Sequence, residues 1–268
     1  MEILGYICAT LVGISLGVLG SGGSILTVPI MVYLMDVNPV DATGYSLFVV
    51  GASSAIGGIK YVRKNLVDLK TAVIFAVPSI LCVFLTRKFL MPAIPNPVFS
   101  FSTFILSKEL FIMLFFALLM MAVAYNMIRN GNYKQPEEKE FQNMNYLWLV
   151  CIGFVSGILT GIVGVGGGFI IIPALVLLAK VPVKMSVGTS LLIISFNSLS
   201  GFMGEVLERN EKIDYKFLLT FSALAIAGIF IGFRIALKKS PVEIKKMFGW
   251  FVLVMGICIF ISEVFFGQ

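Results

Sequence analysis

Two glycine-rich stretches hold the residues most suited to binding a ligand. The first is "GSGGS" at Gly20 to Ser24, and the second is "GVGGG" at Gly164 to Gly168. Without side chains, glycine amides can turn toward one point. A helix that starts after each cluster also exposes unpaired N–H groups that carry roughly half a positive charge. The chemistry that this pattern predicts is the binding of an anion.

Hydroxyl groups at the start of the following helices add hydrogen-bond donors, in "DATGYS" at 41–46 and "SVGTS" at 186–190. Capping or bonding to the residue's own helix is the alternative role for each hydroxyl, and Asn197 either bonds a neighbouring helix or lines a pathway. The predicted substrate-binding residues are Ser21, Gly22, Gly23, Ser24, Ser46, Gly166, Gly167, Gly168, Thr189 and Ser190, with Thr43, Ser53 and Asn197 along a pathway.

Several other chemistries lack the residues that they need. The chain has no histidine, so it offers neither an HExxH pattern nor the base of a Ser-His-Asp triad. Its four cysteines stand alone in apolar stretches, where we expect small buried hydrophobic side chains. No charged residue lies clearly at the centre of an apolar run, and Glu205 and Lys60 are expected at the membrane interface. The sequence therefore predicts no enzyme, no cofactor and no metal site.

The composition is that of an integral membrane protein. Hydrophobic residues make up 59% of the chain, only 13% of residues are charged, and the mean hydropathy is +1.00. The chain opens with Met1-Glu2 and not with a basic region, so we expect the first apolar run to be retained and not cleaved as a signal peptide. Eight apolar runs follow one another at Ile3–Met35, Thr43–Ile59, Thr71–Leu85, Leu110–Ile128, Tyr146–Ala179, Val187–Met203, Phe217–Ile235 and Phe248–Ile261.

The first and fifth runs are much longer than the roughly 20 residues that a helix needs to cross a bilayer. Each contains one of the two glycine clusters near its middle. We therefore expect each to form two shorter segments joined by irregular backbone, which a membrane tolerates where it lines a cavity. The predicted fold is an all-α integral membrane protein with about eight hydrophobic segments in a single transmembrane domain, 1–268.

The two halves are homologous copies. Adding 144 to the positions of Gly13, Gly17, Gly20 and Pro29 reaches Gly157, Gly161, Gly164 and Pro173, and after a two-residue insertion "VDLK" at 67–70 matches "IDYK" at 213–216. The copies are repeat 1 at 1–128 and repeat 2 at 144–268, joined by a polar linker at 129–143.

The basic residues favour inverted repeats. If each long run crosses the membrane once, the repeats are parallel and the 20 lysines and arginines divide evenly. If each run is a hairpin or a pair of crossings, the second repeat inverts, fourteen basic residues gather on one side and six on the other, and both termini lie outside. The net charge of +6 then reflects orientation in the lipid bilayer and not nucleic-acid binding.

The doubled "GxxxGxxGxGG" motif followed by proline, with the "GTS"-type start of the next helix, resembles the sulfite exporter TauE/SafE family, also called the toluenesulfonate uptake permease family. The resemblance implies a transporter of sulfite, sulfoacetate or other organosulfonates in the cytoplasmic membrane of a prokaryote. The first copy departs from the second by Ser21 and Ser24 in place of Val165 and Gly168. These differences imply an asymmetric site.

The expected mechanism is alternating access around a midplane anion site made by the two glycine breaks. Two other functions stay open at this point: a cation or metal-ion carrier that uses the same broken helices, and a membrane scaffold subunit that transports nothing. The expected partners are the small anionic substrate and the lipid bilayer, and association into a homo-oligomer is left open.

Overall fold

The computed structural model describes residues 2–20, 22–95, 97, 99–101, 104–129, 146–163, 168–208 and 214–266. The all-α membrane fold predicted from the sequence is confirmed. In these ranges, five helices are both long and apolar enough to span a bilayer, and several shorter apolar helices accompany them. The predicted linker at 129–143 lies outside the described residues except for Arg129, which ends a helix.

The elements of the first half are α1 (Glu2–Leu19), α2 (Gly22–Met35), α3 (Pro39–Val62), α4 (Leu69–Leu85), the π-helical turn η1 (Thr86–Leu90), α5 (Met91–Ala93), β1 (Phe99–Phe101), β2 (Phe104–Leu106) and α6 (Lys108–Arg129). Those of the second half are α8 (Tyr146–Val163), α9 (Gly168–Pro173), the π-helical turn η2 (Ala174–Leu178), α10 (Val183–Glu208), α11 (Tyr215–Lys238) and α12 (Pro241–Phe266). The short antiparallel hairpin β1–β2, which pairs Phe99 with Leu106, is an addition to the predicted helices.

Local sequence explains where several helices begin. Asn38 accepts a hydrogen bond from the N–H of Val40 and precedes Pro39, which suits the first turn of α3. The side chain of Asp68 caps α4, and the side chain of Asp214 caps α11 by accepting from the N–H of Phe217 at 3.0 Å. These caps satisfy N–H groups that have no partner within their own helix.

The first apolar run is broken where the glycine cluster predicts. Helix α1 ends at Leu19, Gly20 adopts a positive φ of 72°, and α2 begins at Gly22. Glycine takes this left-handed conformation without the strain that a Cβ atom causes. In the fifth run, α8 is described as far as Val163 and α9 from Gly168, and 164–167, which hold the predicted second break, lie outside the described residues.

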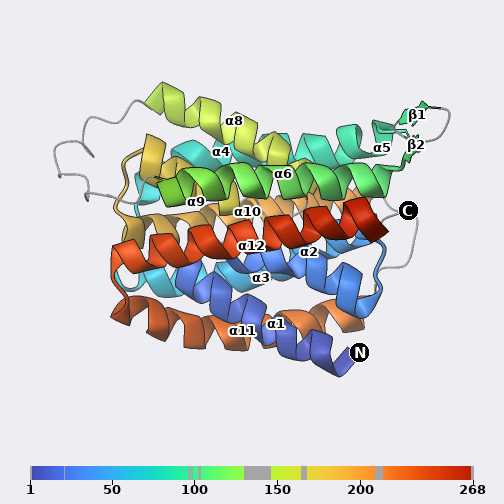
Figure 1. The fold of residues 1–268 in the computed structure, drawn as a ribbon. Coiled ribbons are helices and arrows are strands. Elements are labelled where there is room, and N and C mark those ends of the chain that lie inside the picture. The colour runs from blue at the N-terminus through green and yellow to red at the C-terminus, as the bar shows by residue number, and fades with distance from the viewer. Residues whose placement is uncertain are drawn as a thin grey trace.

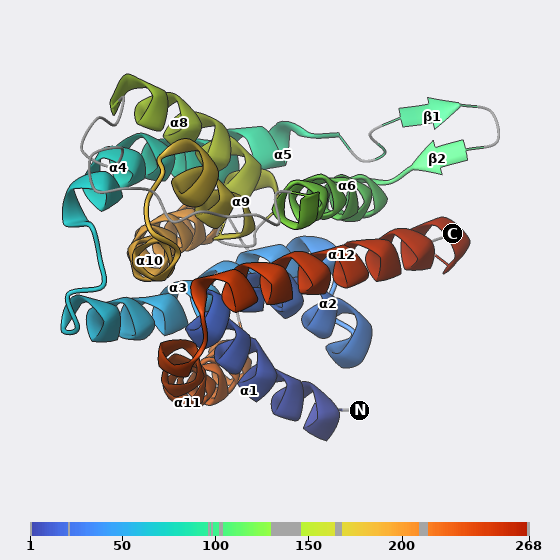
Figure 2. The ribbon, with the colours of Figure 1, turned by 60° about the vertical axis from the view of Figure 1, so that its left-hand side comes forward.

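The two halves interlock instead of forming separate bodies (Figures 1 and 2). Helix α1 packs against α11, and α8 packs against α4 in the matching way, while α3 lies along α10 and α6 along α12. Glycines permit the close approach: a Cβ atom on Gly13 would lie 1.8 Å from the carbonyl oxygen of Ala225, and one on Gly157 would lie 2.6 Å from that of Ser79. The small-residue stripes of α1 and α8 therefore serve helix packing.

Apolar side chains also face outward along single helix faces, as expected for contact with lipid. Val73, Val77 and Leu81, spaced four residues apart on α4, are each more than half exposed. Of the four cysteines, Cys82 is buried as predicted. The prediction of burial is wrong for Cys151 and Cys258, which lie exposed on apolar helices, because the period of each helix turns them away from the packed core.

Candidate functional site

The structure places the first glycine break against the second half of the chain. A Cβ atom on Gly20 would lie 2.9 Å from Cγ1 of Val187 and 3.0 Å from Oγ of Ser190, both on α10. Gly22 and Gly23 form the first turn of α2, and Ser24 is fully buried there. The predicted first break and one predicted hydroxyl, that of Ser190, thus lie together.

The second glycine cluster is described only at Gly168. Gly168 is buried at the start of α9, and α9 contacts α2, so the two helices that follow the glycine clusters meet inside the bundle. Three of the predicted site residues, Ser21, Gly166 and Gly167, lie outside the described residues.

Several of the predicted hydroxyl groups donate to their own helices. The Oγ of Ser190 donates to the carbonyl of Val187 at 2.9 Å, and the Oγ of Ser46 donates to that of Thr43 at 3.0 Å. Ser53 likewise donates to the carbonyl four residues before it, at 2.6 Å. Because a hydroxyl has one proton, each group must rotate before it can donate to a bound anion.

Thr189 joins two helices instead of facing Gly20. Its Oγ1 accepts a hydrogen bond at 2.9 Å from the N–H of Asp68, the residue that caps α4. The equivalent contact in the other half uses a tyrosine, since the N–H of Asp214 donates to the hydroxyl of Tyr45 at 3.4 Å. Thr189 thus holds the start of α4 against α10, and Tyr45 holds the start of α11 against α3.

Asn197 bonds a neighbouring helix. Its Nδ2 donates to the Oγ of Ser79 on α4 at 2.6 Å, and both side chains are buried. The Oδ1 of Asn197 has no hydrogen-bond partner within the described residues. A buried amide oxygen of this kind is costly unless a water or a ligand reaches it.

A buried ion pair lies near the start of α3, and the sequence did not predict it. Nη1 of Arg87 lies 3.1 Å from Oε2 of Glu205 and donates to Oγ1 of Thr43 at 3.0 Å. The side chain of Arg87 is 0% exposed and that of Glu205 is 12% exposed. The expectation that Glu205 lies at the interface missed this pairing.

A signal for the burial of Arg87 does exist in the sequence. The apolar run that precedes it, 71–85, resumes at "FLMPA" (89–93), so Arg87 and Lys88 interrupt one continuous helical segment, 69–93. A charge inside such a segment usually faces a protein interior and has a functional partner.

Two glycines make room for the ion pair. A Cβ atom on Gly44 of α3 would lie 3.1 Å from Cδ of Glu205, and one on Gly204 would lie 3.3 Å from Cβ of Arg87. On the other side, Gly161 in the last turn of α8 lies against Thr86, the neighbour of Arg87. The ion pair therefore stands beside the helix that leads into the second glycine cluster.

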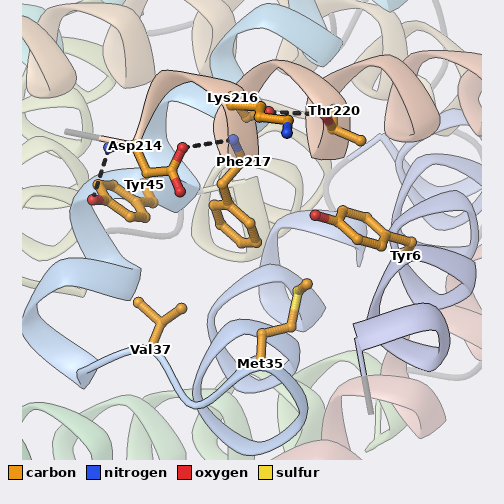
Figure 3. Close-up of a pocket in the computed structure, with 8 residues that line it drawn as sticks. All are labelled: Tyr6, Met35, Val37, Tyr45, Asp214, Lys216, Phe217 and Thr220. Atoms are coloured by element: carbon orange, nitrogen blue, oxygen red, sulfur yellow. Dashed lines mark hydrogen bonds between the residues drawn. The ribbon is translucent and has the colours of Figure 1, made fainter.

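A pocket of about 360 Å³ opens at the end of the bundle where α11 begins (Figure 3). It lies between α1, the connection from α2 to α3, and the first turns of α11. One ammonium group, from Lys216, and the hydroxyls of two tyrosines and a threonine make it suitable for a polar solute. None of the predicted site residues lines it. The lining residues are Tyr6, Met35, Val37, Tyr45, Asp214, Lys216, Phe217 and Thr220.

Comparison with known protein families identifies the chain at family level. A family model described as "Sulfite exporter TauE/SafE" matches residues 5–259. The chain belongs to the sulfite exporter TauE/SafE family. The resemblance noted in the doubled glycine motif is thereby confirmed across nearly the whole chain.

Relatives of this TauE/SafE protein carry the name "probable membrane transporter protein". One from Xylella fastidiosa (strain 9a5c) is 30% identical over 92% of this chain and 90% of its own length. Others come from Methanocaldococcus jannaschii, at 27% identity over 92% of both chains, and from Bacillus subtilis (YunE), at 26% identity over 100% of this chain and 98% of its own. No solved structure matches significantly.

These comparisons, together with the apolar helices, make the TauE/SafE chain a multi-pass membrane transporter. Among the residues that the structure describes, no group of three or more His, Cys, Asp or Glu side chains is placed to hold a metal ion. The candidate site thus consists of neutral amides and hydroxyls at the first break, and the Arg87–Glu205 pair lies beside the last turn of α8.

Proposed function

We propose that the protein is a secondary transporter of small sulfur-containing anions such as sulfite, sulfoacetate or other organosulfonates. It works by alternating access around an anion site that the two glycine breaks form near the bilayer midplane. The family supports the substrate class through its name, and the relatives support transport through theirs. The membrane is the cytoplasmic membrane of a prokaryote.

The observation that carries this proposal is the position of the first break. Gly20 takes a positive φ and lies on Ser190 of the opposite half, while α2 begins two residues later. The first N–H groups of a helix have no partner within it and attract negative charge. An anion at this place is met by one repeat's amides and the other repeat's hydroxyl.

The proposal includes inverted repeats in one transporter domain. In support, α1 begins at the end of the bundle where both termini lie, whereas α8 begins at the opposite end (Figure 1). Backbone details also recur at an offset of 144: Asp36 and Lys180 have φ values of 55° and 52°, each just after a helix. An odd number of crossings in each half produces such an inversion.

Charge supports an orientation with both termini outside. The connections opposite the termini carry Arg63, Lys64, Lys180 and Lys239, and basic residues gather on the cytoplasmic side of membrane proteins. A negative-inside membrane potential then favours exit of an anion by about 2.3 kcal/mol per charge per 100 mV. Export is therefore the direction that needs no coupling ion.

Exchange between the two sides requires a conformational change. Ser24, Ser46 and Ser190 are each 0% exposed, so the proposed site is closed to solvent in this structure. Sliding of one repeat against the other along the α3–α10 contact would expose the site to either side in turn.

The experiment is flux of labelled sulfite into proteoliposomes, with the sodium gradient, the pH gradient and the membrane potential set independently. Saturable flux that thiosulfate or sulfoacetate inhibits and chloride does not is the expected result. Movement of sodium or a divalent ion across the membrane without any sulfite flux would favour the cation carrier. Absence of flux under every gradient would overturn the proposal and favour the scaffold function.

A further inference from the structure

The ion pair between Arg87 and Glu205 has a counterpart in the other half that contains no carboxylate. The repeat register pairs Glu205 with Tyr61 and, after the two-residue insertion, Arg87 with Phe233. The structure supports this pairing: Tyr61 lies against Gly188 as Glu205 lies against Gly44, and the rings of Tyr61 and Phe233 meet edge-on at 4.8 Å.

The aromatic pair shows what the fold requires at this position. A well-packed apolar pair usually stabilises a protein as well as a buried ion pair does, because burying two charges costs their hydration. The ammonium of Lys60, which is only partly buried, lies over the rings of Phe230 and Phe233 at 4.1 and 4.8 Å and forms no ion pair with a carboxylate within this aromatic pair. Since one half packs with aromatic rings, packing alone does not explain the charges in the other half.

The surroundings of Arg87 suit the binding of an anion. Arg87 is the one charged residue among the buried side chains of the described part of the chain. Its planar guanidinium matches an oxyanion that accepts two hydrogen bonds, which a carboxylate, a sulfonate and sulfite can all do. Thr43, a predicted pathway residue, accepts from the same Nη1 that contacts Glu205.

We propose that Arg87 is the positive charge of the transport site and that Glu205 occupies it in the absence of substrate, so that an incoming sulfur oxyanion displaces the Glu205 carboxylate. This inference rests on the proposed function. Glu205 is the more exposed partner, at 12% against 0%, so its carboxylate can move outward while Arg87 stays in place. The ion pair then acts as a gate on one side of the site, and the Tyr61–Phe233 pair closes the other side.

The first test compares the thermal stability of the purified full-length protein in chloride, sulfite and gluconate salts of equal concentration. Glu205→Ala removes the carboxylate and leaves a small space beside Arg87. We expect chloride or sulfite to raise the unfolding temperature of this variant by about 4 °C or more relative to gluconate, which is too large for the space. For the wild-type protein, we expect chloride to have less than a quarter of that effect.

Two further variants are controls. The double variant Arg87→Gln/Glu205→Ala lacks the positive charge and is expected to respond equally to all three salts. Glu243→Ala removes the carboxylate of an exposed ion pair, in which Nζ of Lys239 lies 3.1 Å from Oε2 of Glu243. The unfolding temperature of this variant should be the same in chloride and in gluconate. Equal unfolding temperatures of Glu205→Ala in chloride, sulfite and gluconate would overturn the proposal that an anion displaces Glu205 from Arg87.

Removing one partner of a buried ion pair can prevent folding, so Glu205→Gln serves as a second variant that keeps the side-chain shape. It is expected to respond to chloride in the same direction, with a smaller shift. If Glu205→Ala does not fold, an identical response of Glu205→Gln to all salts overturns the proposal.

The flux assay separates this inference from the function on which it rests. Anion-dependent stability of the Glu205 variants without sulfite flux by the wild type would retain the gate and reject sulfur anions as the substrate. Sulfite flux by the wild type without anion dependence in the variants would retain the function and reject the gate.

Discussion

The hydroxyl of Tyr61, at the end of α3, donates a hydrogen bond to the carbonyl oxygen of Gly17 at 3.1 Å. Gly17 lies in the last turn of α1, just before the break at Gly20, where carbonyl groups have no partner further along their own helix. The bond therefore ties the broken end of one helix to a continuous one. It fixes the position at which the chain leaves α1 and enters the first glycine cluster.

Replacing Tyr61 with phenylalanine removes this bond and leaves the ring contact with Phe233. We expect a loss of about 1 kcal/mol in stability, because a buried carbonyl loses its partner, which lowers the unfolding temperature by about 2–4 °C. Thermal unfolding of the purified protein measures the effect. Tyr125→Phe, which removes an exposed hydroxyl, is the control, and an equal shift in both variants would contradict the role given to Tyr61.

Gly20→Ala tests the need for a left-handed residue at the break. Alanine at a φ of 72° costs about 1–2 kcal/mol, and its Cβ would meet Val187 at 2.9 Å. We expect lower stability and loss of sulfite flux. Gly57→Ala is the matched control, since its Cβ would have ordinary contacts at 3.4 Å. Full flux in Gly20→Ala would mean that the break does not need this geometry.

A comparison of Gly23→Val with Gly13→Val separates a binding role from a packing role. Valine at position 13 would collide with the backbone of α11, so we expect little folded protein. At position 23, in the first turn of α2, we expect a folded protein that transports less than about a tenth of the wild-type flux, because the amides are shielded from the anion. Size-exclusion chromatography with the flux assay measures both effects. Gly23→Val that folds and transports normally would remove these amides from the site.

Ser190→Ala tests the hydroxyl that lies beside Gly20. Loss of one hydrogen bond to the anion is worth about 1 kcal/mol, so we expect the KM for sulfite to rise about fivefold. Ser156→Ala on α8 provides the comparison, because that hydroxyl is buried, donates to the carbonyl of Gly153 and lies outside the predicted site. An unchanged KM in Ser190→Ala would assign Ser190 to helix bonding alone.

Much of this architecture is readable from the sequence because it depends on local composition. Apolar runs predict the helices through the free energy of transfer into lipid, and the glycine cluster at 20–24 predicts the first break through backbone conformation. The structure places Ser190 next to the first break, but its hydroxyl points to the carbonyl of Val187 in its own helix, and its role in binding stays a prediction.

The tertiary structure alone decided which distant residues meet. Arg87 and Glu205 are 118 positions apart, as are Asn197 and Ser79, and Thr189 meets Asp68 across 121. Each pair joins one repeat to the other, because α4 and the π-helical turn η1 that follows it pack against α10. Sequence periodicity shows that a helix has a buried face, but it does not show which helix covers that face. The membrane class and the break at Gly20 were therefore determined by sequence, and the Arg87–Glu205 ion pair was decided by how the two halves interlock.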